Sequence, residues 1–131
     1  MVARWSRIFN GNPEAIGQAR AFVRTVLDGH ALADDAELSV SELGTNAITH
    51  TDTGEPGGRF VVELEAHPAH LWVAVVDMGA DTEPTLTGGD PSSPAEVNGR
   101  GLFLVEALSA KWGTELAGTG RRVWAELTGS V

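Results

Sequence analysis

Three polar side chains are spaced four residues apart in the middle of the chain: Glu42, Asn46 and His50. In a helix with 3.6 residues per turn, this spacing places them in one line along a single face. A carboxylate and an amide one turn apart can both reach a hydrated divalent cation that carries phosphates, and Mg²⁺ prefers oxygen ligands while keeping several waters. The same pattern is typical of a solvated helix face, because exposed polar stripes are common on amphipathic helices.

A second polar group, Asp77-Met78-Gly79, follows directly after the apolar run from Leu71 to Val76. A carboxylate at the end of a buried strand can accept a hydrogen bond from an exocyclic amine such as that of adenine. Gly79 would let the backbone approach a flat ring closely. The alternative is an ordinary Asp-x-Gly turn that only ends a strand.

Two glycines flank an arginine in Asn98-Gly99-Arg100-Gly101-Leu102, at the opening of a predicted helix. A helix N-terminus offers unpaired N–H groups and a partial positive charge, and glycine lets phosphates come close to them. Arg100 would add a charge-assisted contact. Such local donors matter in a chain with a net charge of −9, whose overall field repels anions. A flexible loop exit without a ligand would also explain the two glycines.

Two helices are expected up to and including the segment that carries Glu42, Asn46 and His50. One begins at Pro13, which suits the first helical position, and Asn12 can cap it. The other begins after Asp34, with Glu37 three residues on in a capping-box arrangement, and runs to about Thr51. The second helix therefore carries the line of polar side chains.

The stretch from Ala80 to Asn98 is rich in Asp, Thr, Pro, Gly and Ser and holds few large apolar residues. A structureless segment of this length is uncommon inside a small domain and is usually functional or mobile. A third helix is expected after it, from about Gly101 to Lys111. The lysine suits the negative end of that helix, and Gly113 can terminate it.

Strands are expected between and around the helices. Alternation of apolar and polar residues from Phe60 to Leu64 predicts one strand, and the run from Leu71 to Val76, apolar on both faces, predicts a central one. The other strands are expected around Trp5 to Phe9, near Thr114 to Leu116 and from Val123 to Leu127. Because helices and strands do not alternate one for one, the fold class is α+β rather than a doubly wound parallel sheet.

Length and composition indicate one domain, residues 1–131. The net charge of −9 repels nucleic-acid phosphates, so no nucleic-acid partner is expected. The absence of cysteine excludes disulfides and thiol nucleophiles. No signal peptide is recognisable, and no apolar run approaches the roughly 20 residues that a membrane span needs. We therefore expect a cytoplasmic protein that makes no membrane contact.

The order of these elements resembles the GHKL ATPase family: Glu-x-x-x-Asn on a helix, Asp-x-Gly after an apolar strand, a long loop of small residues, and Gly-x-Gly opening a helix. A short chain of this kind is most similar to the anti-sigma-factor serine kinases of the RsbW and SpoIIAB type. The resemblance implies a two-layer α/β sandwich, in which a mixed, largely antiparallel sheet carries three main helices on one face. ATP would bind between the layers.

In the second helix, Glu42-Leu43-Gly44-Thr45-Asn46-Ala47 matches the N box of the family. The match implies that Asn46 holds Mg²⁺ and that Glu42 is the general base. His50 stands where related chains often carry a histidine; it has no implied catalytic role, and we expect it to pack at the helix end.

The remaining motifs match the G1 and G2 boxes. Asp77 and Gly79 match the G1 box, in which Asp77 reads the adenine amine. Gly99 and Gly101 match the G2 box, where backbone N–H groups meet the phosphates of ATP. The phosphate-contacting set is then Gly99, Arg100, Gly101 and Leu102, below an ATP lid at about residues 80–98.

The resemblance implies an ATP-dependent switch that binds a sigma factor and phosphorylates a serine on an anti-sigma-factor antagonist. A homodimer is expected, since the anti-sigma relatives work as homodimers. Arg20 and Arg24 on the first helix are either a partner surface or solvated surface charge. The alternative function is a non-catalytic module that uses nucleotide to set its affinity for a partner; it needs Asp77 and the glycines but not Glu42.

Overall fold

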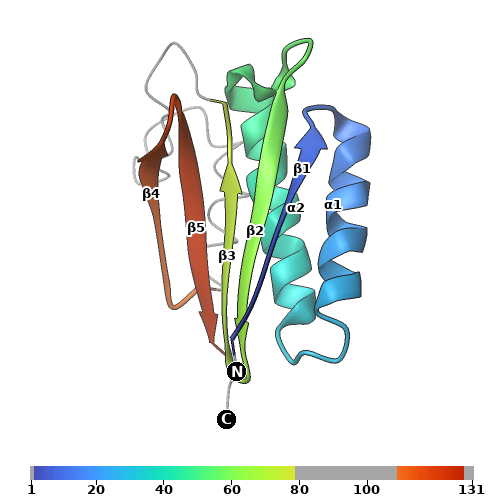
Figure 1. Ribbon diagram of the computed structural model, residues 1–131, viewed down its shortest axis with the longest axis vertical. Coiled ribbons are helices and arrows are strands. Elements are labelled where there is room, and N and C mark those ends of the chain that lie inside the picture. Colours follow the sequence, from blue (N-terminus) through green and yellow to red (C-terminus); the bar gives the residue numbers. More distant parts are fainter. Residues whose placement is uncertain (1, 79–108, 129–131) are drawn as a thin grey trace, which may run out of the picture.

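The structure is a computed structural model and describes residues 2–78 and 109–128, except the side chain of Asp52 (Figure 1). The elements are β1 (Ala3–Asn10), α1 (Pro13–Val26), α2 (Ala33–His50), the 3₁₀ helix η1 (Asp52–Gly54), β2 (Arg59–His67), β3 (His70–Val76), β4 (Lys111–Ala117) and β5 (Gly120–Thr128). Within these ranges, no helix combines the length and the apolar character needed to cross a bilayer.

Five strands form one sheet in the order β1-β2-β3-β5-β4, and every neighbouring pair is antiparallel. Figure 1 shows α1 and α2 lying together against one face of this sheet. The predicted α+β class and two-layer arrangement are confirmed, and the predicted central position of β3 is confirmed as well. The third predicted helix falls mainly on residues outside the described ranges, so two α-helices stand in the described part of the chain.

The core lies between the sheet and the two helices. Cross-strand pairing brings Leu64, Val73 and Ala125 side by side, and all three are buried. Burial alternates along β2 as a strand with one covered face requires. A Cβ on Gly44 would lie 2.9 Å from Cδ1 of Ile16, so the glycine of α2 lets α1 pack closely against it. Each large apolar side chain removed from water contributes roughly 1.5–3 kcal/mol, which holds the two layers together.

The predicted start of α1 is confirmed. Asn12 has extended backbone angles, and its Oδ1 accepts a hydrogen bond of 3.0 Å from the N–H of Ala15. Pro13 occupies the first helical position, where its missing N–H leaves no intrahelical bond unmade. Local sequence alone therefore fixes where this helix begins.

The predicted capping box of α2 is wrong. The helix starts at Ala33, and Leu32 occupies the N-cap position without a side-chain hydrogen bond. Glu37 is only 9% exposed and binds two guanidinium groups of α1: Nε of Arg20 donates to Oε1 over 3.1 Å, and Nε of Arg24 donates to Oε2 over 3.2 Å. The charge-assisted bonds to α1 are stronger than a reach back to the helix end, so Glu37 clamps α1 to α2.

The predicted C-terminal end of the third helix is also wrong. Lys111 and Gly113 belong to β4, which pairs with β5, so neither residue ends a helix. A Cβ on Gly113 would lie 2.9 Å from Cζ2 of Trp124, because the indole ring covers the strand at this point. The glycine is needed for the close approach of a neighbouring side chain rather than for a helix cap.

Candidate functional site

The line of polar side chains predicted on one helix is present on α2. Glu42 and Asn46 are half-buried and one helical turn apart, and their neighbours Leu43 and Ala47 are buried in the core. His50, the last residue of the helix, is exposed. The expectation that His50 packs at the helix end is therefore wrong, since its side chain is exposed to solvent.

Asn46 carries a polar atom that lacks a partner. Its side-chain nitrogen Nδ2 is buried and has no hydrogen bond within the described part of the chain. An unpartnered buried polar group costs about 1–3 kcal/mol, so an amide left in this state points to a group that completes its bonding. Half a rotation of the amide would place Oδ1 where Nδ2 lies, because the two ends have the same shape. An oxygen donor at this position fits Mg²⁺.

Asp77 lies one residue past the end of β3 and is 7% exposed. The N–H of Arg121 donates to Oδ1 of Asp77 over 3.1 Å, and the N–H of Asp77 donates to the carbonyl of Arg121 over 2.9 Å. This reciprocal pair ties the carboxylate to the backbone of the neighbouring strand β5. A buried and oriented carboxylate of this kind is suited to accept a hydrogen bond from a ligand amine.

The packing of α2 on β3 makes the helix of Glu42 and Asn46 a neighbour of the strand that directly precedes Asp77 (Figure 1). The other predicted site residues lie outside the described residues: Gly79, Gly99, Arg100, Gly101 and Leu102, together with the predicted lid at 80–98. The structure therefore positions the predicted metal ligand, general base and base-reading carboxylate. The phosphate-binding glycines remain a prediction from the sequence.

One residue near the site was missed by the sequence analysis. Thr53, in η1, is fully buried, and its hydroxyl accepts a hydrogen bond of 3.1 Å from the N–H of Met78, the residue after Asp77. Nothing distinguishes this threonine in the sequence, because it stands in a turn-rich segment where threonine is ordinary. Its contact to Met78 joins positions 25 residues apart, which only the fold reveals.

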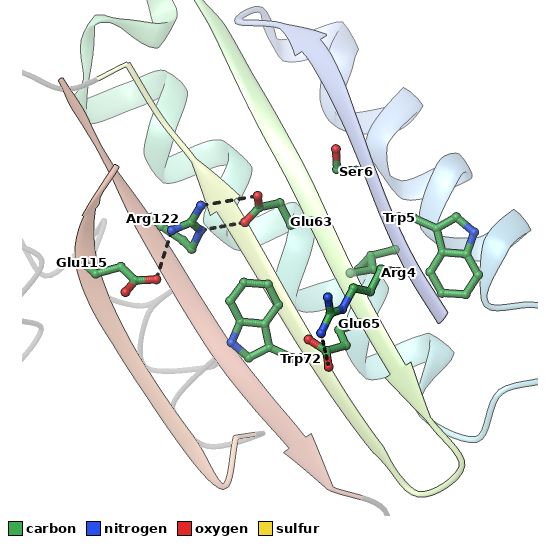
Figure 2. Close-up of a pocket in the computed structure, with 9 residues that line it drawn as sticks. Arg4, Trp5, Ser6, Glu63, Glu65, Trp72, Glu115 and Arg122 are labelled. Atoms are coloured by element: carbon green, nitrogen blue, oxygen red, sulfur yellow. Dashed lines mark hydrogen bonds and ion pairs between the residues drawn. The ribbon is translucent and has the colours of Figure 1, made fainter. Parts of the chain in front are cut away.

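The face of the sheet opposite the helices holds a hollow of about 500 Å³ (Figure 2). Trp72 stands in it, and Arg122 lies between Glu63 and Glu115. Nε of Arg122 is 2.7 Å from Oε1 of Glu63, and Nη1 of Arg122 is 3.1 Å from Oε1 of Glu115. These bonds raise the pKa of Arg122, with the hydrogen bond to Glu63 as the largest cause. The hollow is separated from the candidate site by the sheet itself.

Charges on this open face balance. The pairing of the strands places four basic and four acidic side chains on it: Arg4, Arg59, Lys111 and Arg122, with Glu63, Glu65, Glu115 and Glu126. A surface without net charge is notable on a chain with a net charge of −9. The acidic excess must therefore lie elsewhere on the protein.

Comparison with known proteins gives one family and two relatives. The family described as "Histidine kinase-like ATPase domain" matches residues 9–127. An uncharacterized protein of Streptomyces coelicolor is 34% identical over 69% of this chain and 82% of its own length. The serine-protein kinase RsbW of Oceanobacillus iheyensis is 29% identical over 73% of this chain and 68% of its own length.

Proposed function

Because the chain belongs to the histidine kinase-like ATPase domain family, we propose that it is an ATP-binding regulator that transfers the γ-phosphoryl group of ATP to a serine of a protein substrate. One observation carries this proposal: the side-chain nitrogen Nδ2 of Asn46, buried and without a hydrogen bond to any described residue, lies one helical turn after the half-buried carboxylate of Glu42. The likeness to a relative named as a serine-protein kinase supports the choice of acceptor.

We assign adenine recognition to Asp77. The exocyclic amine of adenine donates to the carboxylate of Asp77, while the N–H of Arg121 holds Oδ1 in place. Guanine carries a carbonyl oxygen at the position of this amine, so two acceptors would face each other. The site is therefore expected to prefer ATP over GTP.

We assign binding of the phosphate end of the nucleotide to α2 and to the glycine motif. Asn46 would hold Mg²⁺ through its side-chain oxygen, together with phosphate oxygens and waters. Bound Mg²⁺ would supply positive charge that offsets the negative charge of the phosphates in this acidic chain. Gly99 and Gly101 would present backbone N–H groups to the phosphates, with Arg100 and Leu102 beside them and residues 80–98 as a lid.

Glu42 is the proposed general base. It accepts the proton of the substrate serine as the serine oxygen forms a bond to the γ-phosphorus. The bond from that phosphorus to the bridging oxygen breaks, and ADP leaves with the electron pair. The products are phosphoserine, ADP and a proton on Glu42 that passes to water.

The partners we propose are a sigma factor and an anti-sigma-factor antagonist that carries the acceptor serine, both in the cytoplasm. Arg20 and Arg24 remain half-exposed despite their bonds to Glu37, with 49% and 66% of their side chains accessible. An acidic patch on a partner could therefore still contact them. Their bonds to Glu37 show that they also have a structural role in joining the helices.

We place the proposed homodimer contact on the open face of the sheet, with a second copy of this chain as the occupant. Two copies of an acidic protein approach most easily through surfaces without net charge, and this face is balanced. It also carries Ile8, which is 59% exposed, and the half-buried Trp72. A twofold axis requires a surface that is complementary to itself, and mixed charges satisfy that requirement.

The proposal is tested by incubating the protein with ATP labelled at the γ-phosphate and with candidate antagonist proteins, followed by detection of phosphoserine. The expected result is label on a serine of the antagonist, only when Mg²⁺ is present. Binding of ATP without any transfer to protein would instead indicate the non-catalytic, nucleotide-dependent module.

A further inference from the structure

Thr53, Arg59 and Met78 close a ring of three hydrogen bonds. The N–H of Met78 donates to Oγ1 of Thr53 over 3.1 Å, the hydroxyl of Thr53 donates to the carbonyl of Arg59 over 3.2 Å, and the N–H of Arg59 donates to Sδ of Met78 over 3.0 Å. Thr53 is fully buried, so water does not compete for its hydroxyl. The ring therefore fixes the backbone of Met78 against the start of β2.

The same threonine is tied to the end of α2. Oγ1 of Thr51 donates to the carbonyl of Ala47 over 2.6 Å and accepts the N–H of Thr53 over 3.0 Å. Hydrogen bonds on the N–H and on the hydroxyl of Thr53 thus connect the residue next to Asn46 with the residue next to Asp77. The proposed metal ligand and the proposed base reader are the sequence neighbours of the two end residues, Ala47 and Met78.

The backbone of η1 packs closely against its neighbours. A Cβ on Gly11 would lie 1.7 Å from the carbonyl oxygen of Thr53, and a Cβ on Gly54 would lie 2.2 Å from the carbonyl oxygen of Ile48. Both distances are far below any contact a real Cβ makes, so only glycine fits at either position. The backbone of Thr53 is held from the side of β1 and from the side of α2.

We propose that Thr53 is a positioning residue for nucleotide selection. It fixes the backbone that follows Asp77, and thereby the orientation of the Asp77 carboxylate, relative to Asn46 on α2. This inference rests on the proposed function of the site. A hydroxyl is required because the position must accept from Met78 and donate to Arg59 at once; serine can do both, and valine, of nearly the same shape, can do neither.

A purely structural role for Thr53 predicts a different outcome. Loss of the hydroxyl would then lower the stability of the protein and affect ATP and GTP equally. A positioning role predicts that the ratio of the two affinities changes, because only the contact to the adenine amine depends on where Asp77 points. The selectivity ratio separates the two roles, and the melting temperature does not.

The experiment compares wild type, Thr53→Val and Thr53→Ser by calorimetric titration with ATP and with GTP in the presence of Mg²⁺. We expect Thr53→Val to weaken ATP binding roughly tenfold, the effect of one lost buried hydrogen bond, and to leave GTP binding unchanged. Thr53→Ser should restore the wild-type preference. Thr25→Val, the same change at an exposed position of α1, is the matched control and should bind like wild type.

Two further measurements test the role of Thr53 independently. Hydrogen exchange at the Met78 amide, measured without nucleotide, should speed up in Thr53→Val and not in Thr53→Ser. In an Asp77→Asn background, Thr53→Val should no longer change the ATP-to-GTP ratio, because the two residues act through one contact. A Thr53→Val protein that keeps the wild-type ratio would overturn the role of Thr53 alone. A wild-type protein that binds no ATP would overturn the proposed function, and this role with it.

Discussion

Asp77 and Arg121 hold each other through a reciprocal pair of hydrogen bonds at the end of the sheet: the Arg121 N–H lies 3.1 Å from Oδ1 of Asp77, and the Asp77 N–H lies 2.9 Å from the Arg121 carbonyl. Backbone groups of a central strand move less than side chains do, so the carboxylate is oriented before any ligand arrives. Binding then requires little reorganisation of the site, which favours affinity and selectivity together.

Replacement of Glu42 separates binding from transfer. Glu42→Ala should bind ATP as wild type does and should lose at least about a hundredfold in the rate of phosphoryl transfer, the usual contribution of a general base. Single-turnover transfer to the antagonist measures this. Glu14→Ala, at an exposed position of α1, is the control. Transfer at the wild-type rate in Glu42→Ala would show that another group accepts the serine proton.

Replacement of Asn46 should affect function and stability in opposite senses. Asn46→Ala removes the unpartnered buried nitrogen, so the free energy of unfolding without nucleotide should stay the same or rise by up to about 1 kcal/mol. Binding of ATP should lose its dependence on Mg²⁺. Chemical denaturation and calorimetry measure the two effects, with Thr49→Ala on the same helix as a control. Mg²⁺-dependent binding retained in Asn46→Ala would exclude it as the metal ligand.

The clamp between the two helices should depend on pH. The hydrogen bond from Arg24 is the largest cause that lowers the pKa of Glu37. A carboxyl whose pKa is lower in the folded state stabilises that state above the unfolded pKa of about 4.3, and the contribution is lost as the pH falls through the lowered folded pKa. Glu37→Gln should therefore be less stable than wild type at pH 7, and the difference should shrink on acidification below about pH 4. Urea denaturation over this range measures it; a constant difference would exclude the charged clamp.

The open face of the sheet can be tested without nucleotide. Wild type should sediment as a dimer, and Ile8→Glu should shift it toward the monomer, because each copy would bring an added carboxylate into the contact. Leu38→Glu on α2 places the same charge on another face and should leave the dimer intact. A monomeric wild type, or a dimer equally weakened by both changes, would contradict the placement of the contact.

The sequence predicted correctly those features of the fold that depend on residues close together in the chain. The cap at Asn12 with Pro13 after it starts α1 where expected, and the apolar run of β3 lies at the centre of the sheet. The first outcome depends on backbone groups a few residues away, and the second on the apolar character of a run that pairs with strands on both edges. The i, i+4 placement of Glu42 and Asn46 follows from the helix alone for the same reason.

The wrong or missing predictions concern residues whose roles depend on contacts with residues far away in the sequence. Glu37 has the spacing of a capping box, yet its carboxylate binds two arginines of α1 and does not cap α2. Lys111 and Gly113 look like a helix end, yet β5 pairs with them. Thr53 was overlooked because its partner Met78 lies 25 residues away. Each case needs a tertiary contact that no local pattern encodes.

Calorimetric titration of wild type and Asp77→Asn with ATP and with GTP, in the presence of Mg²⁺, tests the central claim most directly. We expect wild type to bind ATP at least roughly tenfold more tightly than GTP, about 1.4 kcal/mol, and this preference to vanish in Asp77→Asn at an unchanged melting temperature. Wild type that binds neither nucleotide, or an Asp77→Asn protein that keeps the full preference for ATP, would contradict the account.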